Sequence, residues 1–131
     1  MATIHCIGIG GIGVSALAKW LLTLGYQVTG SDEVAGPQVE VLRARGLTIG
    51  IGADPAHVGP EVELVVFSSA VPSGHPERAA ARERGIPEMN SFALLDKQVR
   101  ERAERMVAAP GGKSATPAVI PKMQIEGDVD P

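Results

Sequence analysis

A glycine-rich turn between an apolar strand and an apolar helix is the feature that most limits how this chain can fold. Residues 3–13 read T-I-H-C-I-G-I-G-G-I-G, and an apolar segment running to Leu24 follows at once. This arrangement is typical of a strand that feeds a phosphate-binding helix N-terminus. In it, Gly8 permits the tight turn, Gly10 lets backbone N–H groups approach a diphosphate, and Gly13 lets the helix pack closely on the strand. The pattern therefore predicts a ligand that is a diphosphate carrying a nucleoside.

Helical and strand-like segments alternate along the chain after this turn. The spacing of apolar residues predicts helices over 14–24, 37–45, 76–84 and 92–105, and strands over 27–31, 47–51, 64–67 and 86–89. We expect Gly25 to end the first of these helices and Ser91 to cap the last. The alternation predicts a single α/β domain, a Rossmann-like doubly wound parallel sheet of about five strands with helices on both faces.

The composition changes after Met106. Prolines stand at positions 110, 117, 121 and 131 and glycines at 111, 112 and 127, with little periodicity between them. We therefore expect a binding domain over 1–106 and a Pro/Gly-rich linker or tail over 107–131.

Charge and cysteine content exclude several classes of partner. The net charge is −3, and basic and acidic residues are interleaved, which argues against nucleic acid. Cys6 is the single cysteine, so the chain has no internal disulfide and suits a reducing cytoplasm. No Cys or His falls at metal-ligand spacing, and no stretch is apolar for long enough to span a membrane. His57 and His75 lie in predicted loops, where we expect surface roles without partners.

Two further segments should meet the glycine turn at the carboxyl edge of the sheet. Asp32 lies 19 residues after Gly13, where an acid would meet a ribose hydroxyl. Ser68, Ser69 and Ala70 follow an apolar strand, and small hydroxyl residues there can donate to phosphate or base. A simple strand-ending turn fixed by the proline at 72 remains an alternative.

Four separated blocks, taken together, carry a specific resemblance. They are residues 4–15 (I-H-C-I-G-I-G-G-I-G-V-S), 30–32 (G-S-D), 68–72 (S-S-A-V-P) and 80–87 (A-A-R-E-R-G-I-P). In this order they resemble the N-terminal, UDP-binding domain of the Mur ligases of peptidoglycan synthesis. The branch they resemble most joins L-alanine to UDP-N-acetylmuramate, and the similarity covers about residues 3–109.

The resemblance implies that this chain binds the UDP moiety of UDP-N-acetylmuramate. It places the diphosphate against Gly10, Gly11, Ile12 and Gly13, with Ser15 nearby on the helix. It also places the uridine ribose at Asp32, and Ser69 and Ala70 in the nucleotide crevice. In the family a central domain binds ATP and, with magnesium, phosphorylates the muramoyl carboxylate before L-alanine attacks.

The family's ATP loop has a degenerate counterpart at 109–116, which reads A-P-G-G-K-S-A-T. Gly112, Lys113 and Ser114 match the family pattern, but Pro110 removes a backbone donor and Pro117 interrupts the helix that should follow. We therefore expect no cofactor and no catalytic residue on this chain, with ATP and magnesium only in a full-length ligase. Ligation would need the missing ligase domains, in cis or in trans.

Two other functions remain open from the residues alone. The same glycine turn and Asp32 would suit an NAD(P)-type dinucleotide-binding module. A regulatory or interaction domain that keeps the fold but has lost its ligand is the third possibility.

Overall fold

The structure, a computed structural model, describes residues 2–108. Its sheet has five strands in the order β3-β2-β1-β4-β5, and every neighbouring pair is parallel. The strands are β1 (Thr3–Ile7), β2 (Gln27–Asp32), β3 (Thr48–Ile51), β4 (Val62–Phe67) and β5 (Glu88–Asn90). The chain builds outward from β1 to β3 and then crosses to β4, so the predicted doubly wound α/β fold is confirmed.

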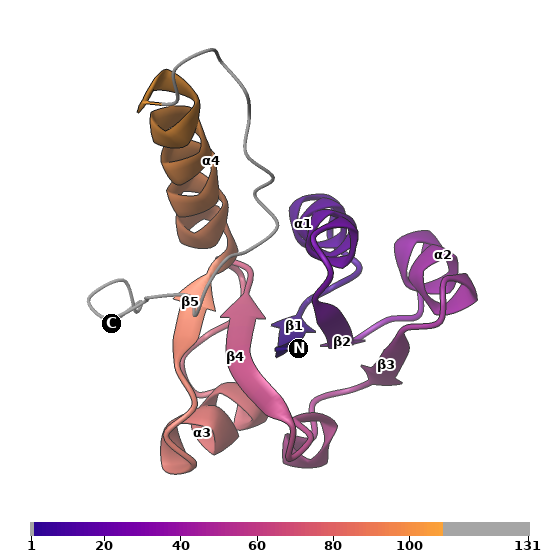
Figure 1. Cartoon of the computed structure of the whole chain (residues 1–131). Helices are drawn as coiled ribbons and strands as arrows, with labels where there is room; N and C mark the ends of the chain where they lie inside the picture. Colours follow the sequence, from indigo (N-terminus) through magenta and orange to yellow (C-terminus); the bar gives the residue numbers. More distant parts are fainter. Residues whose placement is uncertain (1, 109–131) are drawn as a thin grey trace.

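Helices cover both faces of this sheet (Figure 1). They are α1 (Ile12–Thr23), α2 (Pro37–Ala44), the short 3₁₀ helix η1 (Pro55–His57), α3 (Pro76–Glu83) and α4 (Ser91–Ala108). One buried apolar cluster joins α1, α2 and α4 to one face, and a second joins α3 and Val58, the residue after η1, to the other. Gly25, with φ of +99°, follows α1 as expected, since it adopts the left-handed conformation that ends a helix.

The two central strands alternate between the faces, as parallel strands covered on both sides must. In β1, Cys6 belongs to the first apolar cluster and Ile7 to the second. In β4, Val66 and Phe67 divide in the same way. His5 is fully buried on the face of Ile7, and this makes it an unusual polar side chain in the core.

Several predicted boundaries need correction. Ser91 is the first residue of α4, and the cap-like bond comes from Asn90, whose Oδ1 accepts from the Phe92 N–H at 2.8 Å. The same helix continues to Ala108, past its predicted end at 105. The short helix η1 was not predicted. The degenerate loop at Gly112, Lys113 and Ser114 lies outside the described residues, and the domain boundary at 106 stays a prediction.

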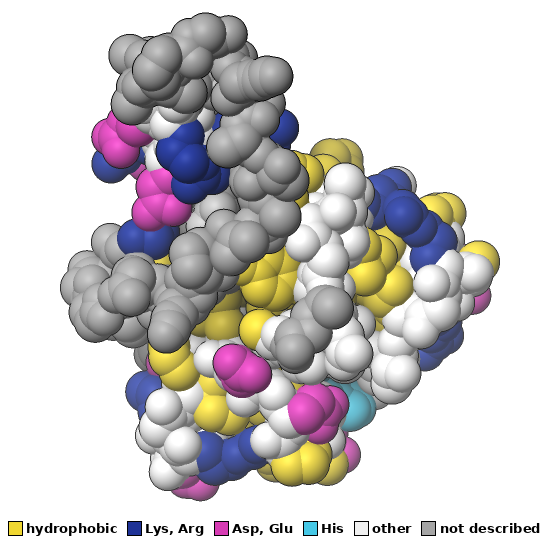
Figure 2. Space-filling view, viewed as in Figure 1, with side chains coloured by type: hydrophobic (Ala, Val, Ile, Leu, Met, Phe, Trp, Pro, Cys, Tyr) yellow, Lys and Arg dark blue, Asp and Glu magenta, His cyan; other side chains and the backbone are white. Residues whose placement is uncertain are grey.

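Charged side chains of the described residues do not gather by sign on the face shown in Figure 2. Dark blue and magenta side chains are scattered among apolar and uncharged ones there. This face therefore lacks the continuous basic surface that nucleic-acid binding requires. No described helix has both the length and the apolar character needed to cross a membrane.

Candidate functional site

A cavity of about 510 Å³ lies at the carboxyl edge of the sheet, where strand order reverses between β1 and β4. Open α/β sheets bind ligands at this position because the loops after the two strands diverge there. The loops after β1, β2 and β4 supply most of the lining, and one residue comes from the segment before α3. The lining residues are Ile7, Gly8, Gly10, Gly11, Ser31, Asp32, Glu33, Val34, Gly36, Gly52, Ser68, Ala70, Val71, Pro72 and His75.

The glycine turn is tightly folded and leaves the start of α1 open. Gly8 has φ of +79°, and the N–H groups of Gly8 and Ile9 both donate to the Ser31 carbonyl, at 2.9 and 3.0 Å. Gly11 precedes α1 and has no side chain to cap it. Because the first N–H groups of a helix have no intrahelical partner, those of α1 remain available to an anion.

Asp32 is held at the cavity by the glycine turn itself. Its Oδ2 accepts from the Gly10 N–H at 2.8 Å, and its Oδ1 accepts from the Val34 N–H at 3.2 Å. A Cβ on Gly10 would lie 2.9 Å from Asp32 Oδ2, so only glycine allows this approach. In this structure the Gly10 N–H therefore orients Asp32, whereas the sequence had suggested that it meets the diphosphate.

The structure places the predicted site residues in three groups. Six of them line the cavity, namely Gly8, Gly10, Gly11, Asp32, Ser68 and Ala70. Ile12 and Gly13 are exposed at the start of α1, and Ser15 is buried behind it, with its Oγ donating to the Ile12 carbonyl at 3.1 Å. Ser69 lies outside the lining, and its Oγ accepts from Asn90 at 3.1 Å.

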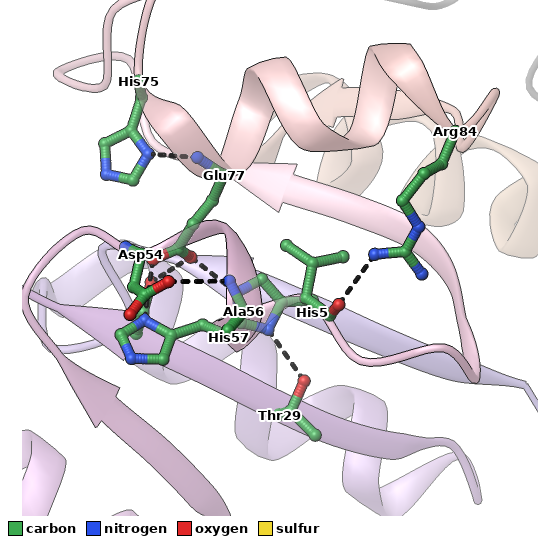
Figure 3. Close-up of polar contacts among 10 residues, drawn as sticks. His5, Thr29, Asp54, Ala56, His57, His75, Glu77 and Arg84 are labelled. Atoms are coloured by element: carbon green, nitrogen blue, oxygen red, sulfur yellow. Dashed lines mark hydrogen bonds and ion pairs between the residues drawn. The ribbon is translucent and has the colours of Figure 1, made fainter.

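Sequence reasoning missed Glu77, a fully buried carboxylate in the first turn of α3 (Figure 3). Its Oε1 accepts from Ser31 Oγ at 2.6 Å and lies 2.8 Å from His5 Nε2. Its Oε2 accepts from the Asp54 N–H at 3.1 Å and lies 2.9 Å from His57 Nδ1. One carboxylate thus joins β1, β2, η1 and α3 beneath the cavity.

The hydrogen bonds decide the charge of this carboxylate. Burial by itself raises the pKa of Glu77, but bonds from His5, Ser31, His57 and the Asp54 backbone together lower that pKa from 4.5 to about 2. The Ser31 carbonyl also accepts hydrogen bonds from the glycine turn. The ionised Glu77 therefore stabilises, through the Ser31 hydroxyl, a residue that lines the cavity and holds the turn.

His57 and His75, for which the sequence identified no partner, are half-buried, and both contact Glu77. His57 binds Glu77, and His75 Nδ1 accepts from the Glu77 N–H at 3.1 Å, which caps α3. A signal was present in the sequence, because His5 is a polar residue within the apolar run of β1. Polar side chains in such positions need buried partners. The described residues contain no group of three or more His, Cys, Asp or Glu side chains able to hold a metal ion.

A buried ion pair between Arg78 and Glu88 supports the loop after β4, where Val71 lines the cavity. Arg78 Nε donates to Glu88 Oε1 at 2.7 Å, and Arg78 Nη1 donates to the Val71 carbonyl at 3.0 Å. The guanidinium also lies 3.6 Å over the ring centroid of Phe67. Helix α3 therefore contacts the loop after β4 through Arg78 and the carboxyl end of β2 through Glu77.

A sequence model described as "Mur ligase family, catalytic domain" matches residues 3–102. The chain belongs to the Mur ligase family. This confirms the resemblance inferred from the four sequence blocks.

Two relatives of this Mur ligase chain are ligases of the same name. The UDP-N-acetylmuramate–L-alanine ligase of Polynucleobacter asymbioticus is 43% identical over 98% of this chain and 27% of its own length. The ligase of that name from Bartonella tribocorum is 39% identical over 100% of this chain and 27% of its own length. This Mur ligase chain thus spans about a quarter of the length of the curated relatives it matches.

Solved structures agree with this assignment. The UDP-N-acetylmuramate–alanine ligase of Thermotoga maritima superposes with a TM-score of 0.73 and 29% identity, over 78% of this chain and 24% of its own. A murein peptide ligase of Psychrobacter arcticus superposes with a TM-score of 0.71 and 31% identity, over 78% of this chain and 22% of its own.

Proposed function

We propose that this chain binds the UDP moiety of UDP-N-acetylmuramate in the cavity between β1 and β4. The observation that carries the proposal is the juxtaposition, at one sheet edge, of an uncapped helix N-terminus and the Asp32 carboxylate. The first suits a diphosphate, and the second can accept hydrogen bonds from ribose hydroxyls. The two relatives described above are UDP-N-acetylmuramate–L-alanine ligases, which supports UDP-N-acetylmuramate as the ligand.

The wider ligase activity belongs to the same proposal. Ligation would require ATP-binding and amino-acid-binding segments in addition to these 131 residues, supplied in cis or in trans. The degenerate loop around Lys113 supports this, because Pro110 removes a backbone N–H that a phosphate loop needs. The proposal also places the protein in the cytoplasm, in keeping with a single buried thiol at Cys6.

Isothermal titration calorimetry of the 131-residue chain tests ligand choice. UDP-N-acetylmuramate and UDP should bind at millimolar concentration or below, and NAD(H) should bind more weakly. Asp32→Asn should weaken binding of both uridine ligands about tenfold or more, since a charge-assisted bond to ribose is lost. Glu63→Gln is the matched control, because Glu63 is an exposed carboxylate on β4. A clear preference for NAD(H), or no binding of either uridine ligand, contradicts the proposal.

A further inference from the structure

His75 has one engaged ring nitrogen and one free one. Its Nδ1 accepts from the Glu77 N–H at 3.1 Å, so this nitrogen carries no proton. The proton of the neutral ring is therefore on Nε2, which makes Nε2 a donor. Among the described residues Nε2 has no hydrogen-bond partner. In Figure 3 the ring lies apart from the Glu77 carboxylate, joined to α3 only through the Glu77 backbone.

The cavity needs side-chain donors if an anion is to bind in it. Two lining side chains, Asp32 and Glu33, are carboxylates, which accept hydrogen bonds and repel phosphate. The hydroxyl of Ser31 already donates to Glu77. This leaves His75 Nε2 and Ser68 Oγ as the side-chain donors without a partner among the described lining residues.

We propose that His75 is a specificity-determining residue of the cavity and donates its Nε2–H to a phosphate oxygen of a nucleoside diphosphate sugar. This inference rests on the proposed function and extends it to a residue outside the glycine turn. The α3 cap fixes the tautomer, so the donor is in place before the ligand arrives. Preorganised donors bind anions without a cost of reorientation.

The cap and the donor can be separated by substitution. In His75→Ser the side chain can still cap α3, since serine is among the best N-cap residues, but it lacks the imidazole N–H. Glu83→Gln is the matched control, because Glu83 is an exposed residue at the end of the same helix. Thermal unfolding of both variants should match the unaltered chain.

Calorimetry with two probes then tests the donor. His75→Ser should bind UDP-N-acetylmuramate about tenfold more weakly, as expected for loss of a hydrogen bond to a charged group. Its affinity for uridine, which has no phosphate, should change less than about twofold. If His75 had a purely structural role, the substitution would weaken the binding of both ligands alike. Nitrogen NMR of the labelled imidazole should show the proton on Nε2 before ligand is added.

Each outcome decides a different point. If UDP-N-acetylmuramate does not bind the unaltered chain, the proposed function falls and this inference falls with it. If it binds, but His75→Ser affects neither ligand or both equally, only the inference is overturned. A proton found on Nδ1 likewise overturns the inference alone.

Discussion

Replacing Glu77 with glutamine should destabilise the protein in a way that depends on pH. The pKa of Glu77 falls from 4.5 to about 2 in the folded state, because hydrogen bonds from four donors outweigh the effect of burial. Each pKa unit corresponds to about 1.4 kcal/mol, so the ionised carboxylate contributes about 3 kcal/mol. That is a large fraction of the stability of an ordinary domain.

The direction of the pH effect follows from proton uptake. The unfolded chain protonates Glu77 near its ordinary pKa of 4.5, whereas the folded chain does so only near pH 2. Between these values the unfolded state binds more protons, so stability falls as the pH falls. The contribution is complete above about pH 5 and lost near pH 2.

Urea unfolding followed by circular dichroism measures both the stability that Glu77 contributes and its dependence on pH. At pH 7, Glu77→Gln should lower the free energy of unfolding by about 3 kcal/mol. As the pH falls towards 2 the difference should shrink to near zero, because a protonated carboxyl and an amide offer similar hydrogen bonds. Glu63→Gln is the control, since that carboxylate is exposed, and should change stability by less than about 0.5 kcal/mol at every pH. A Glu77→Gln variant as stable as the unaltered chain at pH 7, or a difference that does not vary with pH, would refute the reasoning.

Three further predictions concern positions where the structure leaves little freedom. Gly10→Ala places a Cβ 2.9 Å from Asp32 Oδ2 and should displace the carboxylate. Calorimetry should then show binding of UDP-N-acetylmuramate weakened about tenfold, and an unchanged affinity would contradict this. Gly50→Ala places a Cβ 2.3 Å from His57 Nε2, so the ring must leave its position and the free energy of unfolding in urea should fall by about 1–3 kcal/mol. Burial raises the pKa of Cys6 to about 12, so iodoacetamide should label the thiol slowly at pH 8 in the folded protein and rapidly in urea; equal rates would argue against burial.

The fold was predictable because it depends on local periodicity. Apolar runs and their flanking turns identified all five strands, and the glycine turn located the carboxyl edge of the sheet. The cap of α4 was assigned one residue too late, since Ser91 and Asn90 are both good cap residues and only geometry separates them. The helix η1 has three residues and too short a pattern to detect.

The position of the cavity was predicted from the sequence, but the buried contacts of Glu77 that stabilise it were not. Three features placed there from sequence, namely the glycine turn, Asp32, and Ser68 with Ala70, do line it. Glu77 contacts His5, which lies 72 positions before it in the sequence, and Ser31, which lies 46 positions before it. A polar residue in an apolar strand can show that His5 needs a buried partner, but no local pattern identifies that partner as Glu77 or joins His57 and His75 to it.

Spacing along the chain was enough to predict the five strands, the four α-helices, the glycine turn and the edge of the sheet at which the cavity lies. The bond from the Gly10 N–H to Asp32 and the ionised state of Glu77 became evident from the assembled fold and not before. The physical reason is that hydrogen bonding and burial depend on which distant side chains meet. Those encounters exist only once the sheet has assembled and α3 has packed against it.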